Sequence, residues 1–208
     1  MRPTMPFNPH FLMFLFSLLP LVLPARASGQ SGTTLTTRAR MGARYDEVRM
    51  CVATPAGVNG GPAGDVSALF SWSAGGDRRL EFDLPVMRPI LFGAAFRMLQ
   101  FEPSLALTFQ LDRTASRELR AGPVAGVSLH YGPDEDSEPS GEGRTDSFFA
   151  LGPFVGGTGA ITFLRPGHAF DLQIGVTVYA TRLFSFDDDP DHGGFVFGGS
   201  LDVGFRFR

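Results

Sequence analysis

Serine and histidine side chains lie two residues apart at Ser128 and His130. Residues two apart on a β-strand point to the same side, so these side chains can contact each other. An imidazole beside a hydroxyl is the pairing that activates a serine nucleophile, provided that a carboxylate orients the ring. No third partner is identifiable in the sequence. We keep Ser128 and His130 as catalytic candidates, and we favour the interpretation that both are polar residues on the interior side of a strand.

Two acidic segments have the residue types of a cation site. Carboxylates are dense in 134–142 and in 187–191, and oxygen-only ligands suit Ca²⁺. Neither segment has the spacing of an EF-hand loop, so we favour solvated, self-repelling surface loops. The metal-ligand candidates are Asp134, Asp136, Asp187, Asp188, Asp189 and Asp191.

No cofactor is predicted. Gly156, Gly157 and Gly159 lie inside an alternating segment with no helix after it, which argues against a dinucleotide site. The sequence also has no HExxH, GxSxG or phosphate-loop motif.

The composition limits the class of protein. All 18 basic residues are arginine and the net charge is −3, which gives no reason to expect nucleic-acid binding. After the N-terminal region no segment is long and apolar enough for a membrane helix, so a membrane protein would have to cross with strands. The single cysteine, Cys51, excludes an internal disulfide.

The N-terminus has the features of a secretory signal peptide. Arg2 precedes a run from Phe11 to Leu23 that carries no charge, and Ala25-Arg26-Ala27 follows as a small-x-small pattern. The pattern predicts cleavage after Ala27. The alternative, an uncleaved anchor, is disfavoured because a membrane helix needs about 20 apolar residues. The residue directly after the cleavage site is Ser28 and not a cysteine, which argues against a lipoprotein.

The remainder of the chain alternates apolar and polar residues, the pattern of strands with two different faces. Eight segments show it: 48–52, 66–73, 79–84, 105–111, 118–131, 148–163, 170–181 and 195–207. The connections between them alternate between long and short. Bacterial outer-membrane barrels have an even number of strands, short periplasmic turns and longer outer loops, and this chain matches that plan.

Two segments stay open. Residues 33–45 also alternate, and they either extend the first strand or form one of their own. Residues 90–99 are too apolar for an ordinary loop; we favour a short helix, with Pro89 at its start, over a further strand. The strand number is therefore about eight and could reach nine or ten.

The polar faces decide which side of the sheet is enclosed. In 148–163 that face carries small residues and no charge, which suits the narrow interior of an eight-stranded barrel. Charges of both signs lie on the other polar faces, and once enclosed they could pair. They are Arg49, Arg79, Glu81, Asp83, Glu118, Arg120, Asp171, Asp202 and Arg206. The alternative is a soluble, lipocalin-like barrel that holds an apolar ligand inside.

From about residue 45 onward the chain resembles the small eight-stranded outer-membrane proteins of the OmpA, OmpX and OmpW type. Ser200, Phe205 and Phe207 match the C-terminal signal by which the barrel-assembly machinery recognises its clients. Asp202 and Arg208 depart from that signal. Ser128 and His130 resemble, in reversed order, the pair used by barrel enzymes that trim lipid A. Their favoured role remains that of two polar lumen residues near the outer mouth.

We therefore expect an all-β, antiparallel, up-and-down transmembrane barrel, divided into a signal peptide (1–27), an N-terminal segment or extra strand (28–44) and the barrel (45–208). The expected role is structural, surface-interacting or small-solute transport. The alternatives are a lipid-modifying enzyme and the soluble barrel. The expected partners are outer-membrane lipid and the export and barrel-assembly machineries, with no nucleic acid. We expect a monomer in the outer membrane of a Gram-negative bacterium.

Overall fold

The computed structural model describes residues 33–46, 61–87, 99–133, 147–186 and 193–207. All its strands belong to one compact unit, Gly32–Arg208. The strands are β1 (Thr34–Asp46), β2 (Gly61–Ser73), β3 (Arg78–Pro85), β4 (Leu99–Phe101), β5 (Ser104–Arg113), β6 (Arg117–Pro133), β7 (Ser147–Phe163), β8 (Phe170–Ser185) and β9 (Gly194–Phe207). Within these residues no helix is long and apolar enough to cross a membrane.

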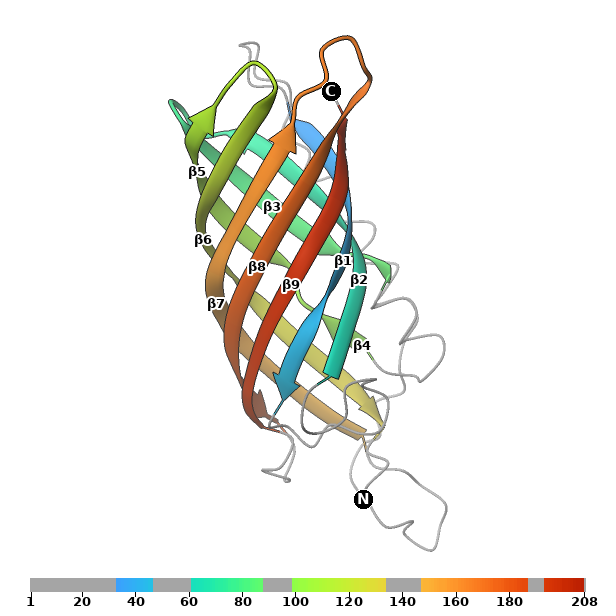
Figure 1. Ribbon diagram of the computed structural model, residues 1–208. Helices are drawn as coiled ribbons and strands as arrows, with labels where there is room; N and C mark the ends of the chain where they lie inside the picture. Colours follow the sequence, from blue (N-terminus) through green and yellow to red (C-terminus); the bar gives the residue numbers. More distant parts are fainter. Residues whose placement is uncertain (1–32, 47–60, 88–98, 134–146, 187–192, 208) are drawn as a thin grey trace, which may run out of the picture. The chain divides into compact units, whose positions relative to one another are not determined.

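The strands close into an antiparallel barrel (Figure 1). Each long strand pairs with the next long strand along the chain, so that β3 pairs with β5, and β1 pairs with β9 to complete the ring. The short strand β4 and the longer β5 both pair with β6. Only Glu102 and Pro103 separate β4 from β5, and proline lacks the N–H that would continue the ladder. β4 and β5 therefore act as one strand that is interrupted at Glu102 and Pro103. The nine strands thus make an eight-stranded type of barrel, as the sequence predicted.

Short and long connections lie at opposite ends of the barrel. The short turns are 74–77, 114–116 and 164–169, and the long connections are 47–60, 86–98, 134–146 and 186–193. Gly167 adopts a φ of 82° in the third short turn, a left-handed conformation that glycine adopts without steric cost. The predicted alternation of connection lengths is confirmed.

The first strand of the barrel is β1. The segment 33–45, which the sequence left as either an extension of the first strand or a strand of its own, is therefore a barrel strand. The domain boundary expected at residue 45 falls inside it. The strand expected at 48–52 lies outside the described residues, as does the segment 1–27. Of the segment 90–99, only Leu99 is described, and it begins β4 rather than a helix.

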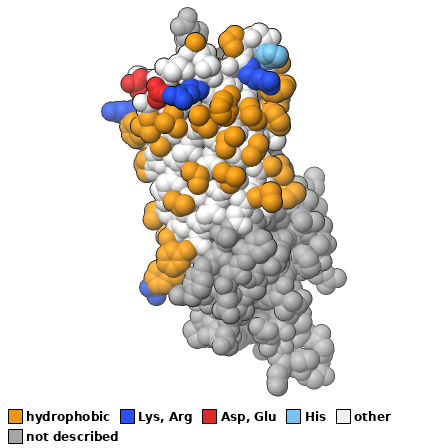
Figure 2. Space-filling model, viewed as in Figure 1, with side chains coloured by type: hydrophobic (Ala, Val, Ile, Leu, Met, Phe, Trp, Pro, Cys, Tyr) orange, Lys and Arg blue, Asp and Glu red, His pale blue; other side chains and the backbone are white. Residues whose placement is uncertain are grey.

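The barrel buries charge and exposes apolar surface. Along the end of β9, Asp202 and Arg206 are buried, whereas Leu201, Val203 and Phe205 are exposed. In Figure 2, hydrophobic side chains cover the visible described wall, and most of the charged side chains gather near the upper end. A soluble lipocalin-like barrel has the reverse arrangement. The sequence-based assignment of the faces is therefore confirmed.

Candidate functional site in the lumen

The described part of the lumen holds three groups of interacting polar side chains. The basal cluster, nearest the short turns, consists of Arg79, Glu118, Arg120, Asp171 and Arg206. The central quartet consists of Arg38, Arg40, Asp83 and Asp202. The Ser–His cluster consists of Gln100, Glu102, Ser128 and His130 and lies toward the long connections.

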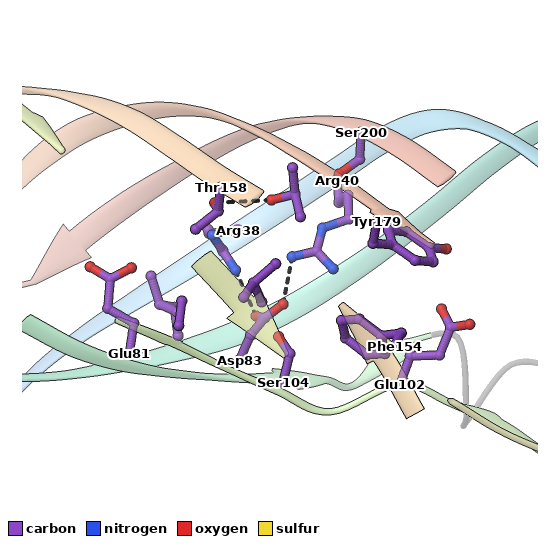
Figure 3. Close-up of a pocket in the computed structure, with 14 residues that line it drawn as sticks. Arg38, Arg40, Glu81, Asp83, Glu102, Ser104, Phe154, Thr158, Tyr179 and Ser200 are labelled. Carbon is purple, nitrogen blue, oxygen red and sulfur yellow. Dashed lines mark hydrogen bonds and ion pairs between the residues drawn. The ribbon is translucent and has the colours of Figure 1, made fainter. Parts of the chain in front are cut away.

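The central quartet joins β1, β3 and β9 across the lumen, and Figure 3 shows three of its members, Arg38, Arg40 and Asp83. Arg38 Nη2 lies 2.8 Å from Asp83 Oδ1, and Arg40 Nε donates to Asp202 Oδ1 at 2.8 Å. Arg40 Nη2 also donates to Asp83 Oδ2, and Arg38 Nη1 lies 3.8 Å from Asp202 Oδ2. Each arginine therefore contacts both carboxylates. Two positive and two negative charges balance, which lowers the cost of burying them.

The basal cluster is centred on Glu118. Its Oε1 accepts from Arg120 Nη1 at 3.0 Å and from Arg79 Nη2 at 3.3 Å, and its Oε2 accepts from Arg206 Nη1 at 2.9 Å. Arg206 Nη2 donates to Asp171 Oδ2 at 3.1 Å. These contacts confirm the predicted pairing for the five residues of the basal cluster, and the contacts of the central quartet confirm it for Asp83 and Asp202. Of the charged residues predicted to share the interior, only Arg49 lies outside the described residues.

The structure gives a reason for Asp202, which departs from the expected assembly signal. The position that is usually glycine carries the carboxylate that contacts both arginines of the central quartet. Ser200 faces the same interior, with Oγ 3.5 Å from Asp202 Oδ1. Phe205 and Phe207 lie on the outward, exposed face of β9. The three residues that match the signal are thus divided between the two faces of one strand.

The structure adds a carboxylate to the Ser–His pair. Ser128 Oγ donates to Glu102 Oε1 at 2.8 Å and lies 2.9 Å from His130 Nε2. His130 Nδ1 lies 3.2 Å from Gln100 Nε2. The sequence did not identify Glu102 because it lies in the break between β4 and β5, where no alternation marks its face. The proline after it is the one signal that a strand is interrupted there.

The geometry of this cluster differs from that of a hydrolytic triad. In a triad the carboxylate contacts the histidine nitrogen that faces away from the serine. Here Glu102 approaches Nε2, the nitrogen that faces Ser128, at 3.6 Å. Because Ser128 has only one proton and donates it to Glu102, His130 Nε2 must donate to Ser128 Oγ. A nitrogen that already carries a proton cannot act as the base that activates the serine.

The burial of Ser128 and His130 also argues against a catalytic role. Ser128 and His130 are both 0% exposed and point into the lumen, so a lipid in the surrounding bilayer does not reach them. The arrangement fits a buried polar network better than a site for lipid chemistry. The six aspartates considered as metal ligands lie outside the described residues. Within those residues no group of three or more His, Cys, Asp or Glu side chains is placed to hold a metal ion.

Aromatic side chains fill the lumen between the central quartet and the Ser–His cluster. The rings of Phe154 and Tyr179 lie 5.4 Å apart. A Cβ at Gly126 would overlap the Phe154 ring, and one at Gly198 would overlap the Tyr179 ring. Glycine at these two positions lets the rings lie against the wall. The barrel is thus packed at this level.

A small cavity of about 40 Å³ remains beside these rings (Figure 3). Arg38, Arg40 and Asp83 line one part of it, and Glu102 lines another. This volume is the size of one or a few water molecules. It is far smaller than the roughly 300–1,000 Å³ of a typical small-molecule pocket. Water can hydrate the charges there, but an apolar ligand does not fit.

Comparison with known proteins supports the fold and nothing finer. No protein family matches the chain, and no curated protein matches it in sequence. Among solved structures, Neisserial surface protein A is similar with a TM-score of 0.57 and 12% identity, over 86% of this chain and 99% of that one. The N-terminal β-barrel domain of Pseudomonas aeruginosa OprF matches with a TM-score of 0.40 and 13% identity, over 86% and 100%. The likeness to Neisserial surface protein A shows that the chain has the fold of the small eight-stranded outer-membrane β-barrels.

Proposed function

We propose that this protein is a monomeric outer-membrane barrel that anchors its long connections at the cell surface. Its role is then structural or surface-interacting. The observation that supports this is the distribution of side chains: ion pairs fill the inside, and an apolar wall faces outward. The solved structure whose fold it shares is, by its title, a surface protein. Export with cleavage near Ala27 and assembly through Ser200, Phe205 and Phe207 belong to the same proposal.

The apolar wall needs a nonpolar environment. Val155, Val178 and Leu201 are 63%, 56% and 56% exposed, and similar side chains surround the barrel. Soluble monomers rarely expose a contiguous apolar patch of more than a few hundred Å². Lipid chains remove this penalty, because no water needs to order around the wall. A closed barrel also leaves no strand edge unpaired in the hydrocarbon.

The packed lumen argues against a transport role. The basal cluster, the central quartet and the Phe154–Tyr179 pair follow one another along the barrel interior. A solute that crossed the barrel would have to break the contacts within each of these groups. Breaking a buried ion pair costs about 3–5 kcal/mol. We therefore place small-solute passage behind the structural role. Lipid modification is also placed behind it, because Ser128 and His130 are sealed from the bilayer.

Fractionation with an unfolding gel tests the proposal. The full chain is expressed in a Gram-negative host, outer membrane and periplasm are separated, and membrane samples are run unheated and boiled. We expect the protein in the outer membrane, with a mobility that changes on boiling as the barrel opens. A periplasmic protein that stays soluble without detergent would refute the proposal.

A further inference from the structure

Arg182 is a charged residue on the otherwise apolar outward face of β8. Its register partner on β9 is Phe195, and its side chain is exposed. The guanidinium carbon lies 5.2 Å from the ring centroid of Phe195 and 5.8 Å from that of Phe184. Among the described residues no carboxylate pairs with it. The charge is thus held by two aromatic rings and has no counter-ion within the described part of the protein.

The position of Arg182 along β8 gives its depth in a bilayer. The residues that share its face from Leu172 to Ala180 are all apolar. A tilted strand crosses the hydrocarbon with roughly 9–11 residues, and the stretch from Leu172 to Ala180 is about that long. Arg182 follows directly, at the end with the long connections. It therefore lies where the hydrocarbon gives way to headgroups.

Aromatic pairs at the same end support this depth. Phe195 and Phe197 stack with centroids 6.2 Å apart, and Phe149 and Phe186 lie 5.3 Å apart. Girdles of aromatic residues mark the two interfaces of outer-membrane barrels. The rings beside Arg182 are thus at the level of such a girdle.

A guanidinium at this depth, with no carboxylate partner among the residues that the structure describes, has the chemistry of a phosphate site. Its planar fork donates two parallel hydrogen bonds to phosphate oxygens. The guanidinium carbon lies over the rings of Phe184 and Phe195, so cation–π attraction holds the charge beside them. We propose that Arg182, held by these two rings, binds the phosphate of an anionic lipid headgroup in the leaflet on the side of the long connections. This inference rests on the proposed membrane location.

Other outward arginines provide a comparison. Arg78 and Arg117 are both exposed and lie next to the short turns. Arg117 forms an ion pair with Asp112 at 3.2 Å, so its positive charge is already partly neutralised. Arg78 shares an outward face with Leu80 and Phe82 but lies at the opposite end of the barrel. It is a matched control for a change of charge alone.

The test measures retained lipid. The full chain is placed in nanodiscs of phosphatidylcholine with a small fraction of phosphatidylglycerol, and the lipid kept after release is counted by native mass spectrometry. We expect the wild type to retain phosphatidylglycerol. Arg182→Gln should retain about tenfold less, the effect of losing a charge-assisted contact. Arg182→Lys should keep part of the binding, because lysine retains the positive charge. It should lose the rest, because an ammonium group cannot donate the two parallel hydrogen bonds of a guanidinium. Arg78→Gln should behave as the wild type.

The outcomes separate this inference from the proposed function. Each variant is first checked for the mobility change on boiling. If the wild type does not insert, the membrane proposal itself fails. If all variants insert and Arg182→Gln retains as much phosphatidylglycerol as the wild type, the lipid site is wrong. Equal losses in Arg182→Gln and Arg78→Gln would show an unspecific charge effect and would also overturn it. Displacement by inorganic phosphate would overturn the lipid source, since a membrane-anchored headgroup should not be displaced.

Discussion

Arg40 on β1 and Asp202 on β9 form a hydrogen-bonded ion pair, with Nε 2.8 Å from Oδ1, across the seam where the first and last strands close the barrel. The two residues are also register partners. The contact therefore joins segments that are 162 residues apart in the chain. It ties closure of the ring to the satisfaction of a buried charge.

Replacing Asp202 should destabilise the barrel strongly. In Asp202→Asn the two arginines of the central quartet share only Asp83, and one positive charge stays buried without a full partner. We expect a loss of about 3–5 kcal/mol in the free energy of unfolding, measured by urea titration in lipid vesicles. Asp112→Asn is the matched control, because its pair with Arg117 is exposed and should contribute about 0–1 kcal/mol. Equal losses in the two variants would contradict the assigned role of the quartet.

The aromatic packing in the lumen gives a second prediction. A Cβ at Gly198 overlaps the Tyr179 ring, whereas the nearest atom to a Cβ at Gly199 is Val178 Cγ1 at 3.8 Å. Gly198→Ala should therefore cost about 1–3 kcal/mol through overpacking, and Gly199→Ala should cost nothing or stabilise slightly. The same urea titration measures both.

A double variant identifies the cause. In a Tyr179→Ala background the ring is absent, so Gly198→Ala should no longer be destabilising. If the cost persists without the ring, the overlap with Tyr179 is not its source.

The outward face of β8 should tolerate charge according to depth. At the middle of the strand, Val178→Arg should cost about 2–4 kcal/mol relative to Val178→Ala, and near the short turns Phe170→Arg should cost about 0–1 kcal/mol relative to Phe170→Ala. Refolding equilibria in vesicles give the four values. A soluble barrel would show small costs at both positions, which would contradict the membrane assignment.

The Ser–His cluster should contribute to stability rather than to catalysis. Ser128→Ala leaves Glu102 and His130 without their shared hydroxyl, and a loss of about 1–3 kcal/mol is expected. Release of fatty acid from labelled phospholipid vesicles should not differ between the wild type and this variant. If the wild type releases fatty acid and Ser128→Ala folds equally well but does not, the enzyme interpretation is correct and the present one is wrong.

The sequence by itself determined most of the strands and their faces. Residues such as Val203 and Asp202 alternate because neighbouring side chains on a strand point to opposite sides, and that rule needs no tertiary information. The contrast between short and long connections predicted that the strands run up and down between the two ends of the barrel. The charge signs on the polar faces were enough to predict that buried charges would pair.

Only the tertiary structure decided which charges pair and which segment begins the ring. Arg40 meets Asp202 because β1 closes on β9, and register between the ends of a chain leaves no local signal. Glu102 contacts Ser128 because both β4 and β5 pair with β6. The alternation of side chains does not reveal this pairing, because it is interrupted at Pro103. The aromatic rings on Arg182 depend in the same way on the β8–β9 register. Alternation determines the face of a residue, whereas its neighbours on that face depend on strand pairing, which involves residues distant in the chain.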